Sequence, residues 1–247
     1  MKTIAIGDVH GCLGELQDLL TKCKYEPTTD KLYLLGDLVD RGPDSAGVIA
    51  FARRLSKLYG AECVKGNHDD KHVRFRRHYN TEKATGKKNP MKFNDRNMAE
   101  HLKLTDEDVA WMEALPNVIM PPSLPGYACV HAGFNPFRGG AKNWGKECLF
   151  IRYIDVSSNN TVGLDRDLKQ PENSIFWADL WTGPEKVLYG HCVHSYKEPL
   201  IINGTYGLDT GCCFGGRMTA AVFHDPAAEP EIVQVQAFDT YTKPFNI

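Results

Sequence analysis

The sequence predicts an α/β fold in which two packed, mixed β-sheets are flanked by helices and carry an inserted helical cap. In the first half of the chain, short apolar runs alternate with segments of helical periodicity. In the second half, short apolar strands are separated by turns. The chain has 247 residues, 42% of them hydrophobic, which is enough for a sizeable core. We therefore predict one domain over residues 1–247, with a cap at about 71–115.

The first half of the chain is typical of a βαβαβ unit. Strands are expected at residues 2–7, 31–36 and 61–66, and helices at 12–24 and from a first turn containing Pro43 to just before Gly60. The first helix is indicated by leucines at helical spacing, and the second by Val48, Ile49, Ala52 and Leu55. Such a unit predicts a parallel sheet whose ligands bind at the carboxyl ends of the strands.

The second half predicts a second sheet that is largely antiparallel. Short strands are expected at residues 127–131, 186–190, 198–202, 218–223 and 231–238. The turn sequence Asn-Gly-Thr at 203–205 is typical of a hairpin. We expect this sheet to pack face to face on the first, between helices.

Composition excludes several classes of protein. The net charge of −2 disfavours a surface built for nucleic acid or anionic membrane, so no specific DNA binding is expected. Eight cysteines without a Cys-x-x-Cys pair indicate reduced thiols rather than a zinc ribbon or a disulfide scaffold. No apolar stretch approaches the roughly 20 residues that span a bilayer, and a strand at the start leaves no room for a signal sequence. We expect a cytoplasmic protein without membrane association.

Polar clusters of one kind follow the expected strands. They are GDVHG at 7–11, GDLVDRG at 36–42 and GNHDD at 66–70. Two later strands are also followed by a histidine, in the segments VHAG (130–133) and YGHCVHSY (189–196). At the edge of a parallel sheet, the first three would bring together Asp8, His10, Asp37, Asp40, Arg41, Asn67 and His68. Carboxylates, imidazoles and a carboxamide suit divalent ions such as manganese, iron or zinc. Cations would also relieve the repulsion between the carboxylates.

These runs resemble the hallmarks of the phosphoprotein-phosphatase branch of the calcineurin-like, binuclear metallophosphoesterases. The family patterns GDxHG, GDxVDRG and GNH(E/D) occur here in order. The sequence looks closest to the symmetrical diadenosine tetraphosphatases, through its GNHD, VHAG, IRY and LDTGCCFGGRMTA segments. The resemblance covers nearly the whole chain and implies a metallophosphoesterase-type sandwich.

The resemblance also implies roles for individual residues. Asp8 and His10 would hold one metal, Asp37 would bridge, and Asn67, His131 and His191 would hold the other; Arg41 would clamp the phosphoryl group, His68 would be a general acid oriented by Asp40, and Arg152 would be a second phosphate-binding arginine. The implied cofactors are two divalent ions, with manganese favoured and iron, zinc or cobalt as alternatives. Such a pair can share a water, lower its pKa and direct the resulting hydroxide at phosphorus.

The cap is the one strongly basic part of the chain. Residues 71–103 contain ten lysines or arginines against three acidic residues, a local charge of +7. Two interpretations stay open. In the first, the charges only solvate a helical surface, as most charge runs do. Alternatively, KHVRFRRH at 71–78 guides a polyphosphate to the metals while Phe75, Tyr79 or Phe93 stacks on a base.

Other polar residues have ordinary structural interpretations. Four histidines are expected to be solvated: His72, His78, His101 and His224. We expect His194 to lie at the surface or to support a metal ligand, and Asp69 and Asp70 to stabilise a helix N-terminus. A tight turn is expected to contain Cys212 and Cys213.

The sequence therefore predicts a metal-dependent phosphohydrolase that cleaves dinucleoside polyphosphates such as diadenosine tetraphosphate. The alternatives are a serine/threonine protein phosphatase or other phosphomonoesterase, a capped-RNA pyrophosphohydrolase, and an inactive binding module. The partner is accordingly a phosphorylated small molecule or a phosphoprotein.

Overall fold

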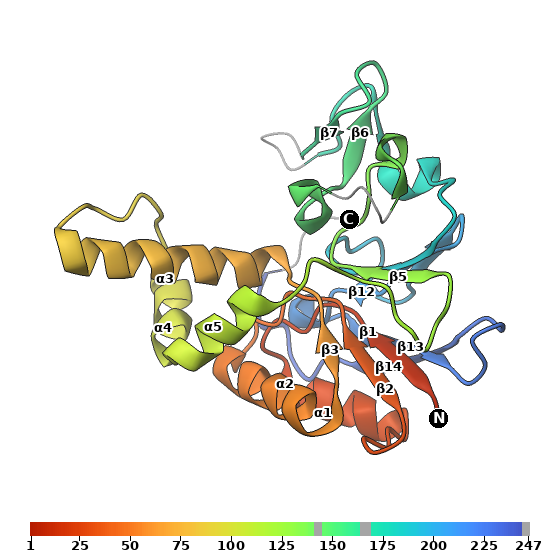
Figure 1. Ribbon diagram of the computed structural model, residues 1–247, viewed down its shortest axis with the longest axis horizontal. Helices are drawn as coiled ribbons and strands as arrows, with labels where there is room; N and C mark the ends of the chain where they lie inside the picture. Colours follow the sequence, from red (N-terminus) through yellow and green to blue (C-terminus); the bar gives the residue numbers. More distant parts are fainter. Residues whose placement is uncertain (141–144, 164–168, 244–247) are drawn as a thin grey trace.

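Two mixed β-sheets lie face to face in the computed structural model, which describes residues 1–140, 145–163 and 169–243. Helices α1 and α2 cover the outer side of one sheet, and helices α3 to α5 project from the same body (Figure 1). The predicted fold class, a mixed α/β sandwich with helices, is confirmed. Several details differ from the prediction.

One side of the first sheet is parallel and the other side is antiparallel. Its strands are β12 (Asp209–Thr210), β13 (Arg217–Phe223), β1 (Thr3–Ile6), β2 (Lys31–Leu34) and β3 (Glu62–Cys63) in that order, with β14 (Glu231–Gln236) also paired to β13. The predicted parallel order β1-β2-β3 is confirmed. The assignment of β13 and β14 to the second sheet is wrong, because β13 pairs antiparallel with β1 and brings β14 with it.

The second sheet is not largely antiparallel, as predicted. Its order is β10 (Leu200–Ile202), β11 (Thr205–Gly207), β9 (Lys186–Tyr189), β5 (Tyr127–Val130) and β4 (Val118–Ile119). The three central strands run parallel, and only the edge strands β10 and β4 pair antiparallel. Parallel neighbours need long crossover connections, which β5 and β9 have. The predicted hairpin at 203–205 joins β10 to β11.

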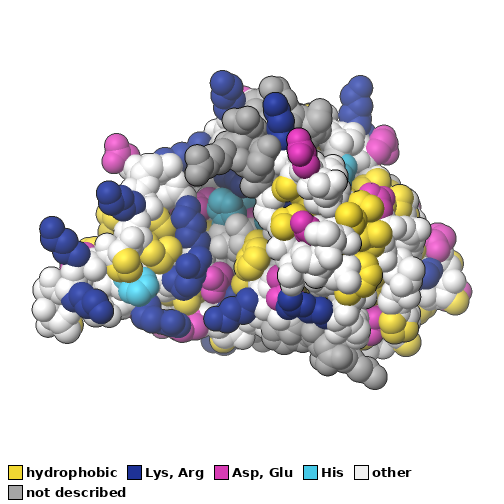
Figure 2. Space-filling model, turned by 90° about the horizontal axis from the view of Figure 1, so that it is seen from above, with side chains coloured by type: hydrophobic (Ala, Val, Ile, Leu, Met, Phe, Trp, Pro, Cys, Tyr) yellow, Lys and Arg dark blue, Asp and Glu magenta, His cyan; other side chains and the backbone are white. Residues whose placement is uncertain are grey.

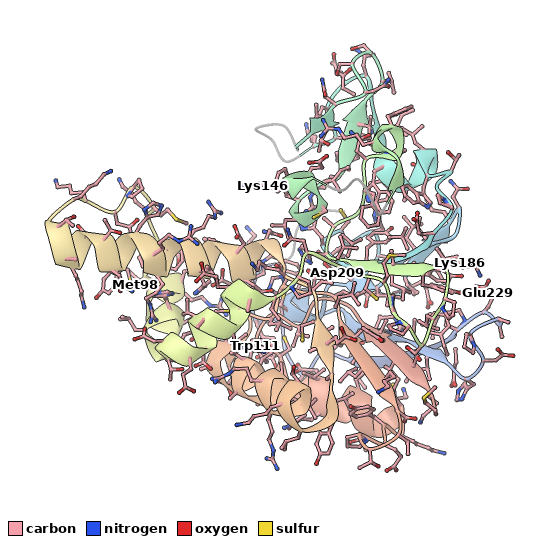
Figure 3. All side chains as sticks on the ribbon, in the orientation of Figure 1. Met98, Trp111, Lys146, Lys186, Asp209 and Glu229 are labelled. Atoms are coloured by element: carbon pink, nitrogen blue, oxygen red, sulfur yellow. The ribbon has the colours of Figure 1, made fainter. Side chains whose placement is uncertain are left out.

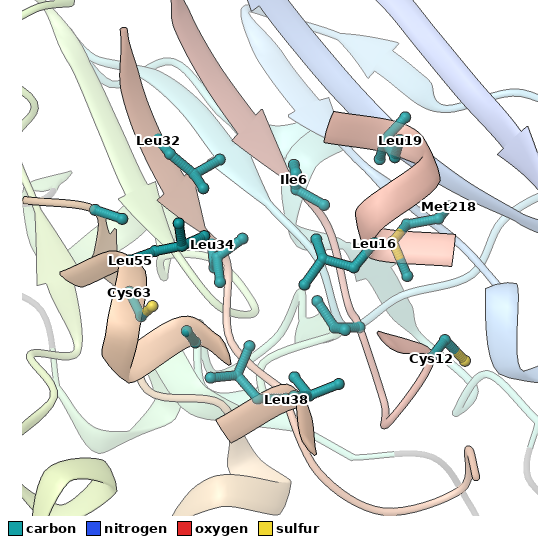
Figure 4. Packing of buried hydrophobic residues seen from close by; sticks show 14 of the residues in the cluster. Ile6, Cys12, Leu16, Leu19, Leu32, Leu34, Leu38, Leu55, Cys63 and Met218 are labelled. Carbon is teal, nitrogen blue, oxygen red and sulfur yellow. The ribbon is translucent and has the colours of Figure 1, made fainter. Parts of the chain in front are cut away.

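Alternation along the strands divides the apolar residues between separate cores. In β1, Ile4 and Ile6 face α1 and α2, whereas Ala5 faces the second sheet. In β5, Tyr127 and Cys129 face the first sheet. Figure 4 shows Ile6 and Leu34 packed with Leu16 of α1. Both sheets therefore have a buried face in the sandwich and a second buried face outside it.

Helices α1 (Leu13–Lys22) and α2 (Ser45–Tyr59) cover the first sheet as predicted. The Asp44 side chain caps α2 by accepting a hydrogen bond from the Gly47 backbone nitrogen (2.8 Å). Gly60 ends α2 in the left-handed conformation (φ 71°). Pro43 therefore precedes the helix rather than lying in its first turn, because Asp44 supplies the cap.

Short elements, rather than α-helices, cover the outer side of the second sheet. They are β6 (Tyr153–Asp155), β7 (Thr161–Val162), β8 (Ser174–Phe176) and the 3₁₀ turns η1 (Pro136–Arg138), η3 (Lys146–Leu149) and η4 (Trp177–Leu180). Trp177 and Trp181 pack there against Tyr189 of β9 and one another. These large aromatic rings fill the space that a helix would otherwise occupy.

The cap consists of α3 (Asn67–Thr85), α4 (Asp95–Lys103) and α5 (Asp106–Ala114). Helix α3 starts directly after the strand β3, where Asp69 accepts a hydrogen bond from the Gly66 backbone nitrogen (2.9 Å). Helices α4 and α5 lie against α2 and so tie the cap to the body. In the described part of the chain, no helix combines the length and the apolar character that crossing a membrane requires.

Candidate active site

The polar clusters that follow the strands meet at one place. Asp8 and His10 follow β1; Asp37, Asp40 and Arg41 follow β2; Asn67 and His68 open α3 after β3; His131 and His191 follow β5 and β9. Arg152 comes from the segment before β6, and its Nη2 donates to the His191 carbonyl oxygen (3.0 Å). The structure thus brings together every residue for which the sequence predicts a metal-binding or catalytic role.

Sharp backbone turns aim these side chains at a common centre. His10, Asp37, Asp40, Arg41 and His191 all have positive φ, between 45° and 69°. This conformation is uncommon for residues other than glycine, and it concentrates at functional sites. Close approach of the loops is also required, since a Cβ on Gly190 would lie 2.0 Å from Asp8 Oδ1. Glycine is the one residue that leaves this carboxylate in place.

Two histidines have their tautomers fixed by backbone carbonyl groups. His10 Nδ1 donates to the Val39 carbonyl oxygen (2.8 Å), and His131 Nδ1 donates to that of Leu35 (2.9 Å). A neutral ring that donates through Nδ1 keeps its lone pair on Nε2. Burial and the nearby Arg41 guanidinium lower the pKa of His10 well below its usual value, which favours the neutral ring. Both Nε2 atoms are therefore available as metal ligands.

Asp37 lies between two groups of potential ligand atoms. Its Oδ2 is 3.5 Å from His10 Nε2, and its Oδ1 is 3.4 Å from His131 Nε2. One group contains His10 and His68, and the other contains His131 and His191, with Asp37 common to both. Within each group, one ligand atom per residue lies within 4.8 Å of the others. The single carboxylate can thus reach a cation on either side.

Further ligand atoms complete the two groups. Asp8 Oδ2 is 3.6 Å from His10 Nε2, and Asn67 Oδ1 is 3.0 Å from His131 Nε2. Asp8 Oδ2 and His191 Nε2 are buried and have no hydrogen-bond partner among the described residues. Buried polar atoms without partners are costly, so a bound cation is the natural partner for both. This mixture of oxygen and imidazole donors fits divalent metal ions.

The raised pKa values of two buried carboxyl groups also indicate unbalanced negative charge at the site. Burial, together with repulsion by Asp209 and Asp37, raises the pKa of Asp8 well above its usual value. Asp209 is 6% exposed, and burial raises its pKa as well. Figure 3 shows Asp209 near the junction of the two sheets and the cap. Cations at the site would offset this repulsion.

Two arginines border the metal-ligand groups. The Arg41 guanidinium donates to His10 Nε2 (2.8 Å) and to His68 Nε2 (3.1 Å). Arg152 lies beside the other group, where it also donates to Cys192 Sγ (3.2 Å). A guanidinium on each side suits a group with several anionic oxygens, such as a phosphoryl group.

His68 and Asp40 form a hydrogen-bonded pair. His68 Nδ1 donates to Asp40 Oδ2 (2.7 Å), so the Nε2 atom of His68 faces the site. Burial favours the neutral form of Asp40, but hydrogen bonds from His68 and His72 outweigh it and hold the Asp40 pKa far below its usual range. Asp40 is therefore a permanent carboxylate that orients the imidazole.

The prediction that His72 and His101 are solvated is wrong. Both are buried, at 0% and 1% exposure, and His72 Nε2 donates to Asp40 Oδ1 (2.8 Å). Helix α4 covers this side of α3 and supplies His101. The sequence of α3 is highly charged and does not show that another helix buries one of its sides. One signal was available for His72, because it lies four residues after His68 and so on the same side of the helix.

Asp209 is a further residue of the site, and no role was predicted for it from the sequence. Its Oδ1 accepts a hydrogen bond from the Gly211 backbone nitrogen (2.9 Å), and its charge acts on Asp8. It lies in the LDTGCCFGGRMTA segment that carries part of the family resemblance. That segment was the available signal.

The remaining polar residues largely follow the sequence predictions. Asp69 accepts hydrogen bonds from the Gly66 and Leu38 backbone nitrogens at the N-terminus of α3, and Asp70 pairs with Arg74. His194 is exposed beside Phe176. Cys212 and Cys213 lie in the 3₁₀ turn η5 (Cys212–Phe214). His78 is half-buried, and His224 is exposed and pairs with Glu231. All eight cysteines, each within the described ranges, are free and buried.

Most of the basic residues proposed to guide a polyphosphate are engaged within the cap. Arg74 pairs with Asp70, Arg76 with Asp106, and Arg77 with Glu113. The aromatic rings are also occupied: Phe75 is buried and stacks on Phe93, with ring centroids 3.9 Å apart. Phe75 therefore cannot stack on a base without rearrangement of the cap.

Lys71 is a cap cation that lies beside the site. Its Nζ is 3.6 Å from Asp40 Oδ2 and 4.9 Å from the Phe93 ring centroid. Seen from above, lysine and arginine side chains gather beside a hollow in which histidine side chains are visible (Figure 2). Positive charge thus reaches the rim of the site from the first turns of α3.

Comparison with known proteins gives consistent results. Residues 1–226 match the calcineurin-like phosphoesterase family. The chain is 30% identical to a protein of Oceanobacillus iheyensis named bis(5'-nucleosyl)-tetraphosphatase PrpE, asymmetrical, over 95% of this chain and 92% of that protein. It is 29% identical to a symmetrical bis(5'-nucleosyl)-tetraphosphatase of Erwinia tasmaniensis, over 91% of this chain and 95% of that protein.

A solved structure agrees with the sequence comparisons. The crystal structure of a protein provisionally named a diadenosine tetraphosphatase superposes with a TM-score of 0.74 at 28% identity. It covers 96% of this chain and 94% of that chain. The family resemblance seen in the motifs is therefore confirmed, and the donor groups around Asp37 suit the divalent ions of a metallophosphoesterase. The chain belongs to the calcineurin-like phosphoesterase family.

Proposed function

We propose that this metal-dependent phosphohydrolase cleaves dinucleoside polyphosphates, with diadenosine tetraphosphate as the leading substrate. The observation that carries the proposal is the position of Asp37 between two sets of ligand atoms, with a guanidinium beside each. Relatives over nearly the whole chain are named tetraphosphatases of both the symmetrical and the asymmetrical kind. Such a substrate offers a chain of anionic oxygens to these cationic groups.

The proposed cofactors are two divalent ions, with manganese first and iron, zinc or cobalt as alternatives. When bound, such ions lower the pKa of a water molecule and neutralise phosphoryl oxygens. Asp8 and His10 would hold one ion, Asn67, His131 and His191 would hold the other, and Asp37 would serve both.

The other site residues act on the phosphate and on the leaving group. Arg41 and Arg152 bind non-bridging oxygens of the phosphoryl group and orient it, as bidentate donors can. His68 Nε2 faces the site and accepts a hydrogen bond from Arg41, so it carries a proton only once that guanidinium has turned to the phosphate. From this protonated state, His68 gives the proton to the departing oxygen. Asp40 fixes the His68 ring through Nδ1.

A phosphomonoesterase, including a serine/threonine protein phosphatase, is the second candidate. The His68–Asp40 pair favours it, because an ester leaving group needs a proton more than a nucleotide phosphate does. Capped RNA is a weaker third candidate because it also carries a polyphosphate bridge. A binding module without activity is the fourth.

Product analysis separates these candidates. The purified protein is incubated with manganese and diadenosine tetraphosphate, a phosphopeptide or capped RNA, and the products are resolved by chromatography. We expect the tetraphosphate to be consumed fastest. Two molecules of ADP would indicate symmetrical cleavage, and ATP with AMP would indicate asymmetrical cleavage. Faster release of phosphate from the phosphopeptide would contradict the proposed substrate.

We also propose one domain over residues 1–247, in which the cap at about 71–115 contributes to substrate binding, and a cytoplasmic location. Eight free thiols support the location, because reduced cysteines are typical of reducing compartments.

Lys71 provides a test of substrate guidance by the cap. Lys71→Gln is expected to raise KM about three- to tenfold for diadenosine tetraphosphate and less than about twofold for a small aryl phosphate, since a rim charge attracts the longer anion more strongly. Added salt should reproduce the effect, because it screens exposed charges beyond about 8 Å. Steady-state kinetics measure both constants.

The matched control is Lys87→Gln, which removes an exposed cation just beyond the far end of α3 and should change neither KM. Equal changes in KM for the two substrates in Lys71→Gln would show that the cap charges only solvate its surface.

A further inference from the structure

A chain of hydrogen bonds leaves the site at His68 and continues into the cap. Its links are His68 Nδ1 to Asp40 Oδ2 (2.7 Å), Asp40 Oδ1 to His72 Nε2 (2.8 Å), His72 Nδ1 to His101 Nδ1 (3.1 Å) and His101 Nε2 to Arg76 Nε (2.9 Å). His68, His72 and Arg76 lie on one side of α3, four residues apart, and His101 comes from α4.

The chemistry of the groups gives the chain one direction. Arg76 Nε can only donate, so His101 Nε2 must accept and carries no proton. The neutral His101 ring then has its proton on Nδ1 and donates to His72 Nδ1. His72 in turn has its proton on Nε2 and donates to Asp40. A charged His72 would place its Nδ1–H group against that of His101 at 3.1 Å, and a charged His101 would place its Nε2–H group against the Arg76 Nε–H group at 2.9 Å, so both rings are neutral.

Packing holds this arrangement in place. Arg76 donates from Nη2 to the Leu104 carbonyl oxygen (2.9 Å), and its Nη1 pairs with Asp106. The rings of Phe75 and Phe93 lie against His101, with centroids 4.9 Å and 5.6 Å from it. Burial, His72 and Arg76 together lower the pKa of His101 to about 3, which agrees with a neutral ring.

We infer that Arg76, His101 and His72 are positioning residues that fix the Asp40 carboxylate from the cap and so orient His68. This inference rests on the proposed general-acid role of His68. Asp40 accepts a hydrogen bond on each oxygen, from His72 on one and from His68 on the other. Without His72 the carboxylate can rotate, and the His68 ring loses its fixed direction. The cap is then part of the catalytic geometry as well as a wall of the site.

The tautomers can be observed directly by NMR. Protein with ¹⁵N-labelled histidine is loaded with zinc, which is diamagnetic, and long-range ¹H–¹⁵N spectra assign the protonated nitrogen of each ring. We expect His101 as the Nδ1–H tautomer and His72 as the neutral Nε2–H tautomer. A charged His72, or a His72 proton on Nδ1, would overturn the inference without any measurement of activity.

Kinetics on monoesters with different leaving groups test the consequence. His101→Phe keeps a ring among Phe75 and Phe93 but removes both links. For a phosphomonoester with an alkoxide leaving group, we expect kcat to fall about tenfold or more, a loss typical of removing a residue that orients a ligand. For p-nitrophenyl phosphate, kcat should fall less than about threefold. KM should stay unchanged for both esters. His101→Gln can donate and accept, and should recover most of the rate.

Lys83→Gln is the matched control, because Lys83 is exposed on the same helix and lies outside the chain of hydrogen bonds. It should leave both rates near those of the wild type. An equal fall for both esters in His101→Phe, with no recovery in His101→Gln, would show a merely structural role and overturn the inference. If His68→Asn slows all esters equally, the general-acid proposal fails, and the wild-type tautomers still decide whether the chain exists as described.

Discussion

Replacing Asp37 by asparagine is expected to reduce hydrolysis by at least about 10³-fold, because metal-ion stabilisation of the transition state is worth several kcal/mol. Within the described part of the chain, Asp37 is the one carboxylate within 3.5 Å of a ligand atom in each group, His10 Nε2 on one side and His131 Nε2 on the other. A neutral amide offers one weak oxygen ligand and no charge, so it would hold a pair of divalent ions much less tightly than the carboxylate.

The fold should survive this change. Asp37 has φ 48°, a conformation that asparagine adopts more readily than most residues. Its Oδ1 accepts a hydrogen bond from the His68 backbone nitrogen (2.8 Å), and an amide oxygen can do the same. Circular dichroism and the melting temperature of the variant should therefore stay close to the wild-type values.

The measurement combines turnover of diadenosine tetraphosphate with the metal content of the purified protein. We expect turnover to be lost together with part of the bound metal. Asp18→Asn, at an exposed position on α1, is the control and should change neither quantity. If Asp37→Asn binds two metal equivalents and keeps most of its rate, Asp37 does not bridge.

Arg41 links metal binding to phosphate binding. Its guanidinium donates to His10 Nε2 and His68 Nε2, which are the atoms proposed to bind a cation and to release a proton. A lone pair cannot accept from Arg41 and bind a metal at once. Arg41 must therefore turn away from His10 when a cation binds, and the phosphoryl group is the anion that would receive it.

The sequence predicts the residues of the site better than it predicts the topology of the sheets. Polar residues placed directly after apolar runs lie at strand ends, and parallel strands bring their ends to one edge, so the first three motifs had to meet. His131 and His191 join them because β5 and β9 are also parallel neighbours. The sequence pattern alone does not show that parallel pairing, since short apolar strands look alike in both kinds of sheet.

Long-range pairing and helix packing account for what the sequence could not predict. β13 is buried along most of its length and could have joined either sheet; its partner β1 lies at the opposite end of the chain. The burial of His72 depends on α4, which supplies His101. The amphipathic pattern of α4 does not show that this helix packs against α3. The positive φ angles of residues such as Asp40 and Arg41 leave no mark in the sequence, because the surrounding loops impose them.

His68→Asn is expected to distinguish the two leading functions. Hydrolysis of a serine phosphate expels an alkoxide, which needs a proton in the transition state, whereas cleavage of a phosphoanhydride expels a nucleotide phosphate that leaves readily. General acid catalysis contributes about 10²- to 10⁴-fold where the proton is needed. The variant should therefore lose about that factor on an alkyl phosphate and much less on diadenosine tetraphosphate.

Asp40→Asn should follow the same pattern with smaller losses. It removes the charge that faces His68 Nδ1 at 2.7 Å, but it leaves the ring and its Nε2 atom in the site. His78→Asn is the control, because His78 lies on the same helix outside the hydrogen-bonded chain, and it should not separate the two substrates.

Single-turnover rates of the wild type and these variants, measured on both substrates, isolate the chemical step from product release. A loss in His68→Asn that is confined to the alkyl phosphate assigns His68 to protonation of the leaving group. It would also explain how the same site serves an anhydride substrate, for which the metal ions and the two arginines carry most of the catalysis. Equal losses on both substrates would instead mean that His68 acts on the attacking water or on the phosphoryl group, and the general-acid assignment would be wrong.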